Sequence, residues 1–170
     1  MKGSRAPKLL LAVLAATAIV ASASAALSVH PAGLPVTLTL PSGWSAGSAS
    51  KTAVFNANGG TGHLAVTKGG SFPAGLPFVL FMNTETSSAV KAYKAEDPKA
   101  VVTGKKVVLP SGPAVKIDAT VKHNGAPVSV TLYSLLHNGV TYHFTFFTNG
   151  ASSAGDKAAF ASIAKSIKYS

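Results

Sequence analysis

The chain has 170 residues, a formal net charge of +10 and no cysteine. Without cysteine it can form no disulfide bond, offer no thiol nucleophile and carry no lipid anchor of the bacterial lipoprotein kind. Only five carboxylates are present, at Glu85, Glu96, Asp97, Asp118 and Asp156, so the sequence gives little support to catalysis by a pair of carboxylates.

Residues 1–25 have the three parts of a secretory signal peptide. A basic start is followed by an apolar run, residues 9–20, that is too short for a permanent membrane span. Small residues then form the cleavage pattern that ends at Ala25. We therefore expect cleavage near Ala25 and a secreted, extracytoplasmic product with no transmembrane anchor in its mature form.

The positive charge of the mature chain comes from lysine alone. After cleavage, 12 lysines and no arginine face 5 carboxylates, which gives a net charge of +7. Lysine lacks the planar fork of arginine that suits specific phosphate and base contacts. We expect a solvated basic surface, or contact with an anionic surface as the alternative, and no binding to nucleic acid.

The first half of the mature chain predicts short strands separated by turns. Residues 26–35 show no sustained period and are expected to form a lead-in. Alternation and turn residues then predict strands at 36–40, 53–56 and 63–68, with a turn at 41–44 and a hairpin turn at 58–60.

The segment that follows can be interpreted in two ways. Pro77 suits the first position of a helix, and Asp97 with Pro98 suits its end, which favours one helix between them. However, residues 83–88 are rich in weak helix formers. The alternative is a strand that leads into a shorter helix from Ser87.

The second half predicts a meander of four strands and a closing helix. The strands are expected at 105–109, 113–122, 127–136 and 140–148. Ser153 and Asp156 have capping-box spacing, and they precede an apolar stripe at helical spacing. The stripe consists of Phe160, Ile163, Ala164 and Ile167.

The turns of the meander predict which side chains share a face. A two-residue turn at 124–125 places Val121 opposite Val128 and Ile117 opposite Leu132, which keeps one apolar face consistent.

The same kind of turn at 138–139 would place Phe144 opposite Tyr133, on the face that carries Asp118. Because one slipped residue exchanges the faces of a whole strand, we predict a three-residue turn at 137–139 with a bulge.

In this register the polar side chains of the meander share one face, while Tyr142, Phe144 and Phe146 join the apolar core. We predict that the polar face lines a ligand-binding groove. Its residues are Lys116, Asp118, Ser129, Thr131, Tyr133, Thr141, His143 and Thr145, and the strongest binding candidates are Lys116, Asp118, Thr131, Tyr133, His143 and Thr145.

An enzyme is the alternative hypothesis. A small hydrolase or metal-assisted enzyme would use His143 and Asp118, joined by Ser129 as a nucleophile or by His63 as a metal ligand. The histidines have neither helical nor H-x-H spacing, and the chain has no G-x-S-x-G elbow and no phosphate-binding glycine motif. We therefore expect no catalysis, no metal and no cofactor.

Several segments together resemble the Mog1/PsbP-like superfamily, in particular its exported bacterial members, here without a lipobox. They are the turn Leu40-Pro41-Ser42-Gly43-Trp44, the strand Tyr142-His143-Phe144-Thr145-Phe146 and the closing helix from Phe160 to Ile167. The resemblance implies an α+β domain at 36–170, in which an antiparallel sheet of about six or seven strands is sandwiched by helices. It also implies a binding or assembly role with no common catalytic residues.

Together these features predict a secreted, non-catalytic binding or assembly protein of the cell envelope. We expect a monomer that holds a partner protein or an amphiphilic ligand in a cleft by the sheet, between the sheet and the middle helix.

Overall fold

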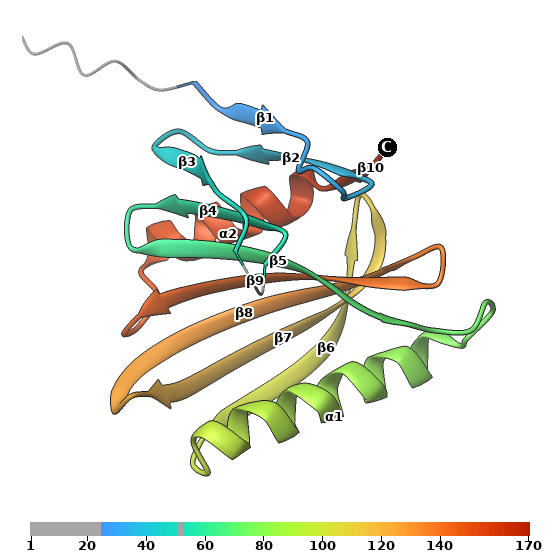
Figure 1. The fold of residues 1–170 in the computed structure, drawn as a ribbon. Helices are drawn as coiled ribbons and strands as arrows, with labels where there is room; N and C mark the ends of the chain where they lie inside the picture. Colours follow the sequence, from blue (N-terminus) through green and yellow to red (C-terminus); the bar gives the residue numbers. More distant parts are fainter. Residues whose placement is uncertain (1–24, 51–52) are drawn as a thin grey trace, which may run out of the picture.

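The computed structural model describes residues 25–50 and 53–170. The predicted signal peptide lies outside these residues except for Ala25. Within the described ranges the chain forms an α+β structure of two helices and two antiparallel sheets (Figure 1). No helix of the described residues is long and apolar enough to span a membrane.

Seven strands of the described chain form the large sheet. In spatial order they are β3 (Trp44–Gly47), β4 (Phe55–Gly59), β5 (Gly62–Ser71), β9 (Val140–Asn149), β8 (Ala126–His137), β7 (Gly112–His123) and β6 (Val101–Leu109). A smaller sheet contains β1 (Leu27–Val29), β2 (Val36–Leu40) and β10 (Lys168–Tyr169) in the order β1-β2-β10. The strand meander predicted for the second half is confirmed.

The two helices cover opposite faces of the large sheet. Helix α1 (Phe78–Glu96) lies under β6, β7 and β8, and α2 (Ala154–Ser166) lies between the large and small sheets (Figure 1). Helix α1 begins directly after Pro77 and is continuous, so the single helix is confirmed and the strand alternative is wrong. The α+β sandwich of antiparallel sheet and helices is also confirmed.

One apolar core fills the space between the large sheet, α2 and β2. From α2 the stripe contributes Phe160, Ile163 and Ala164, and the C-cap Ile167 follows. The sheet contributes residues that are nearly or fully buried, including Leu64, Val66, Tyr133, Leu135, Phe144 and Phe146. The small sheet closes this core from above with Val36, Leu38 and Leu40.

A second core lies on the other face, beneath α1. Val115, Ile117 and Leu132 point toward Phe81 and Ala89 of the helix. The helix approaches β6 closely at Gly104, which has no side chain. A Cβ at this position would lie only 2.3 Å from the Thr86 hydroxyl oxygen. The middle of the sheet is therefore buried on both faces, as adjacent buried residues in β8, Leu132 to Leu135, show.

The register of β7 with β8 agrees with the sequence prediction. Val121 pairs with Val128, and Ile117 pairs with Leu132. The Asn124-Gly125 turn has two residues, each with positive φ, as in a type I′ hairpin.

The predicted three-residue turn before β9 is wrong. His137 pairs with Val140 across a two-residue turn in which Asn138 and Gly139 have φ values of 49° and 75°, and Tyr133 pairs with Phe144. The prediction assumed that one face of the sheet is polar. Because α1 and α2 cover both faces, Phe144 can enter one core without facing Val115 or Ile117.

Three short strands were not predicted. Strand β1 lies in the expected lead-in 26–35 and pairs with β2, as does β10 at the end of the chain. Strand β3 begins at Trp44, whose ring covers Gly59, where a Cβ would lie 2.3 Å from the ring. Such short strands form through tertiary pairing, which local alternation does not reveal. Strand β6 also begins earlier than predicted, at Val101.

A capping box begins α2, as predicted. The Ser153 hydroxyl oxygen accepts from the Asp156 N–H at 3.0 Å, and the Asp156 carboxylate accepts from the Ser153 N–H at 3.0 Å. The Thr61 hydroxyl also donates to Asp156, at 3.0 Å, which ties the helix to the β4–β5 hairpin.

Substituting Ser153→Ala should lower the free energy of unfolding by about 1 kcal/mol, because the cap hydrogen bond to the helix is lost. Urea unfolding followed by circular dichroism measures the change. The control is Ser162→Ala, an exposed position within α2, which should leave stability equal or slightly higher. Equal losses in the two variants would contradict the importance of the cap.

Candidate functional site

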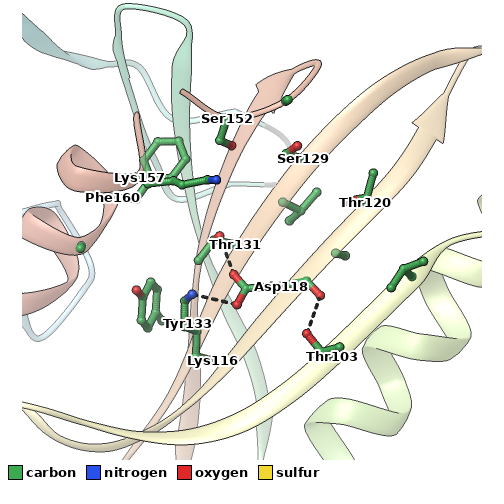
Figure 2. Close-up of a pocket in the computed structure, with 15 residues that line it drawn as sticks. Thr103, Lys116, Asp118, Thr120, Ser129, Thr131, Tyr133, Ser152, Lys157 and Phe160 are labelled. Atoms are coloured by element: carbon green, nitrogen blue, oxygen red, sulfur yellow. Dashed lines mark hydrogen bonds and ion pairs between the residues drawn. The ribbon is translucent and has the colours of Figure 1, made fainter. Parts of the chain in front are cut away.

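An open groove lies between the β6–β8 edge of the large sheet and the beginning of α2. Its volume is about 620 Å³. Figure 2 shows that its sheet wall comes from β6, β7 and β8, while the opposite wall carries Lys157 and Phe160 from α2. Polar lining residues are Thr103, Lys116, Asp118, Thr120, Ser129, Thr131, Tyr133, Ser152 and Lys157.

Asp118 lies on the sheet wall with both carboxylate oxygens occupied. Lys116 Nζ donates to one oxygen at 2.8 Å, and the Thr131 hydroxyl donates to the other at 2.8 Å (Figure 2). The three residues meet because Asp118 pairs with Thr131 across the β7–β8 ladder and Lys116 is two residues away on the same face. The carboxylate is thus fixed in position, and the lysine balances its charge.

Tyr133 lies in the lining of the groove, beside Lys116 (Figure 2). The residue is 6% exposed, and its ring packs edge-on against Phe146, with ring centroids 6.0 Å apart. Burial, with a smaller effect from the negative charge of Asp118, raises the pKa of Tyr133. The phenol therefore keeps its proton at neutral pH. Its hydroxyl makes no hydrogen bond to the described residues, so it is available as a donor or acceptor for a ligand.

The α2 side of the groove adds a positive charge. Lys157 is exposed in the first turn of the helix, and its side chain extends toward the groove (Figure 2). None of the carboxylates in the described ranges forms an ion pair with it. The Ser129 hydroxyl donates to the Gly150 carbonyl at 2.8 Å and fixes the end of β9 against β8.

Thr141, His143 and Thr145 lie on the opposite face of the sheet from Asp118, so the prediction that they share one polar face with it is wrong. His143 Nε2 lies 2.7 Å from a Glu85 carboxylate oxygen, and the Ser134 hydroxyl donates to that oxygen at 2.7 Å. This cluster holds α1 to the sheet. The misplacement follows directly from the wrong turn before β9.

The predicted groove is consequently divided. The structure brings together Lys116, Asp118, Thr131 and Tyr133, but it does not bring His143 or Thr145 to them. A hydrolase or metal-assisted centre built on His143 and Asp118, with Ser129 or His63, is not assembled. The described ranges also contain no group of three histidine, aspartate or glutamate side chains that could hold a metal ion.

The α2 wall of the groove was not predicted, and the prediction that the cleft lies beside the middle helix is wrong, because no residue of α1 lines this groove. Lys157 and Ala161 flank Phe160 of the predicted apolar stripe, so the helical period already placed them beside the buried face. That signal did not reveal which part of the sheet they would meet, because the packing of α2 is a tertiary property.

Comparison with known proteins gives structural matches only. No protein-family model matches the chain, and no curated protein matches its sequence. Among solved structures it is similar to the cyanobacterial PsbP protein CyanoP of Synechocystis sp. PCC 6803, with a TM-score of 0.62 and 12% identity, covering 92% of this chain and 99% of that one.

Two further structures are similar at comparable identity. LpqN of Mycobacterium tuberculosis, described as involved in cell envelope biogenesis, matches with a TM-score of 0.59 and 13% identity over 84% of this chain and 89% of that one. A putative regulator of unknown function from Pseudomonas aeruginosa matches with a TM-score of 0.52 and 12% identity, covering 82% and 94%. The chain therefore has a Mog1/PsbP-like fold, as its sequence motifs predicted.

Proposed function

We propose that this chain is an exported, non-catalytic binding protein of the cell envelope that holds a segment of a partner protein in the groove beside α2. Residues 1–25 would be removed on export, leaving a single monomeric domain in which β1, from the segment expected to be a lead-in, is part of the small sheet. The observation that supports the proposal is the arrangement of polar groups in the groove. The Asp118 carboxylate is held by Lys116 and Thr131, and the Tyr133 hydroxyl and the Lys157 ammonium line the same groove. The fold it shares with LpqN, a protein described as involved in envelope biogenesis, is consistent with this role.

The groove contains hydrogen-bonding and charged groups that can bind a polypeptide. Tyr133 supplies a hydroxyl and Lys157 a cation, neither of which has a hydrogen-bond or ion-pair partner among the described residues, and Asp118 supplies a carboxylate that can accept further N–H groups on its remaining lone pairs. Peptide groups and polar side chains pair with such groups.

An acyl chain has less to contact in this groove. The two aromatic rings in the lining, Tyr133 and Phe160, are 6% and 3% exposed, so their apolar surface is already used in the core. Among the lining apolar residues larger than alanine, only Val101 at the rim is exposed, at 66%. A protein segment is therefore a better fit than an amphiphile, since apolar ligands need extended exposed apolar walls.

The groove also lacks the arrangement of a catalytic centre. Among its described lining residues, Asp118 is the sole carboxylate and no histidine is present. The Asp118 carboxylate is held in place by Lys116 and Thr131, and no histidine of the lining lies beside it to form an acid–base pair. Binding without catalysis is the function that this geometry supports best.

Filling the groove tests the proposal. In Thr120→Trp, an exposed lining residue of β7 becomes a large ring that occupies the groove, whereas Lys122→Trp places the same ring two residues further along, outside the lining. We expect the first variant to recover an envelope partner at least about tenfold less well than wild type, which corresponds to about 1.4 kcal/mol of binding free energy. The second should match wild type.

The measurement is affinity capture from envelope fractions, with quantitative mass spectrometry of proteins and extraction of lipids. Equal recovery by both variants would contradict groove binding. Loss of a lipid with Thr120→Trp would show that an amphiphile is the ligand. Capture that disappears from all forms at about 0.5 M salt would instead indicate non-specific attraction between lysines and an anionic surface.

A further inference from the structure

Strand β6 is one outer strand of the large sheet. It contains 9 residues, while β3 at the opposite edge contains 4, and in the part of the chain that the structure describes β6 pairs with β7 alone (Figure 1). Of its residues only Leu109 is buried. A strand edge of this length presents a row of backbone groups that can pair with another strand.

The β6–β7 register identifies these backbone groups. Leu109 pairs with Gly112 across a two-residue turn, so odd-numbered residues of β6 exchange hydrogen bonds with β7. Pro113, which has no N–H, lies opposite Val108 and fits a pair without hydrogen bonds. The even-numbered residues direct their N–H and C=O groups away from the sheet. They are Val102, Gly104, Lys106 and Val108.

The side chains along this edge form a charge pattern. Lys105 and Lys106 lie in the middle of the strand, and Lys105 pairs with Lys116 of β7. No carboxylate in the described ranges forms an ion pair with either middle lysine, although Lys106 Nζ lies over the Phe78 ring of α1, 5.2 Å from its centroid. The strand ends are apolar and exposed, since Val101 is 66% and Val108 is 78% exposed.

This pattern disfavours a second copy of the chain as the occupant. Antiparallel pairing of two β6 strands centred on Lys105 would place the Lys105 side chains directly opposite each other on the groove face. The two Lys106 side chains would lie diagonally across from each other on the α1 face. Like charges directly opposite each other destabilise a strand pair. A strand with acidic residues at its centre and apolar residues at its ends has the complementary pattern.

We infer that β6 receives an extended acidic segment of the partner protein as an additional antiparallel or parallel strand, an inference that rests on the proposed function. Backbone hydrogen bonds to the even-numbered residues supply the affinity, and the two lysines select the sequence. Val101 and Thr103 belong both to β6 and to the groove lining. A side chain of the added strand that lies beside Thr103 therefore projects from the same face as Asp118 and reaches the groove.

Amide exchange tests the inference directly. The probe is a synthetic peptide of the length of β6, with alternating threonine and valine and two central glutamates, and the matched peptide has two central lysines instead. The glutamate peptide should slow exchange of the N–H groups of Val102, Gly104, Lys106 and Val108 at least about tenfold, as expected for amides that enter a ladder. The odd-numbered amides are already bonded and should change little.

Charge reversal supplies the matched variants. Lys105→Glu with Lys106→Glu should weaken binding of the glutamate peptide at least about tenfold and strengthen binding of the lysine peptide. Lys165→Glu with Lys168→Glu makes the same change of net charge at exposed positions away from β6 and should retain the preference for glutamate. Thermal unfolding verifies that both double variants are folded.

Several results would overturn the inference. They are the absence of glutamate-peptide binding, binding without protection of the even-numbered amides, and an equal loss of affinity in the two double variants. Protection that rises with protein concentration alone would identify a second copy as the occupant. If Thr120→Trp abolishes capture of the envelope partner while Lys105→Glu with Lys106→Glu does not, groove binding stands and the added strand is wrong. If neither abolishes capture, both are wrong.

Discussion

Replacing Phe146 by alanine should lower the free energy of unfolding by about 3–5 kcal/mol, the usual range for removing a buried phenylalanine ring. Phe146 is fully buried between the sheet and α2. Its ring centroid lies 4.9 Å from that of Phe160 and 6.0 Å from that of Tyr133. The substitution therefore opens a cavity in the core that joins α2 to the sheet, and urea unfolding at constant pH measures the loss.

Phe147→Ala is the matched control for this prediction. Phe147 is the next residue of β9, points to the other face, stacks on His63 at 5.1 Å between ring centroids and is partly exposed. Its removal should cost clearly less than removal of Phe146, because part of its surface is already in water. A larger loss for Phe147→Ala would mean that β9 has the opposite register.

Replacing Glu85 by alanine should lower the free energy of unfolding by about 1–3 kcal/mol at neutral pH, because buried hydrogen-bonding groups lose their acceptor. The fully buried Ser134 hydroxyl and His143 Nε2 both bind the Glu85 carboxylate beneath α1. Glu96→Ala, at an exposed carboxylate on the same helix, is the control and should change stability by less than about 1 kcal/mol. Similar losses in both variants would contradict the role assigned to the cluster.

The same carboxylate predicts a dependence of stability on pH. Burial alone would raise the pKa of Glu85, but the hydrogen bonds from His143 and Ser134, with the charge of His143, hold this pKa below the usual value of 4.5. Ionised Glu85 thus stabilises the folded state above about pH 4.5, and this contribution is lost as the pH falls through the lowered pKa. The stability difference between wild type and Glu85→Gln should therefore shrink in acid. A difference that stays constant from neutral pH into acid would contradict the lowered pKa.

Local signals in the sequence predicted much of the fold. Asn124-Gly125 sets the β7–β8 register because a type I′ turn requires positive φ at both of its residues. Ser153 and Asp156 mark the beginning of α2 because their side chains satisfy backbone groups within one turn. Both features depend on neighbours in the sequence, so no knowledge of the tertiary packing was needed.

The face assignment of β9 depended on packing that the sequence does not state locally. Phe144 and His143 could each have been assigned to the core. In a strand covered on both faces, odd-numbered and even-numbered residues both carry buried side chains. Strand β8 gave a usable signal: Leu132 and Tyr133 are adjacent, and both are buried. Such consecutive large side chains indicate two covered faces and would have favoured the two-residue turn at 138–139.

The candidate site was predicted in part for the same reason. Asp118, Thr131 and Tyr133 depend on the β7–β8 register alone, and the structure brings them together. His143 depended on the wrong turn and lies under α1. Lys157 completes the groove only through the docking of α2 on the sheet, which the helical period does not determine.

Capture of an envelope protein by wild type, Thr120→Trp and Lys122→Trp tests groove binding most directly. Wild type and Lys122→Trp should recover the same partner in equal amounts, while Thr120→Trp recovers at least about tenfold less. Equal recovery by all three folded proteins would show that the groove beside α2 is not where the partner binds.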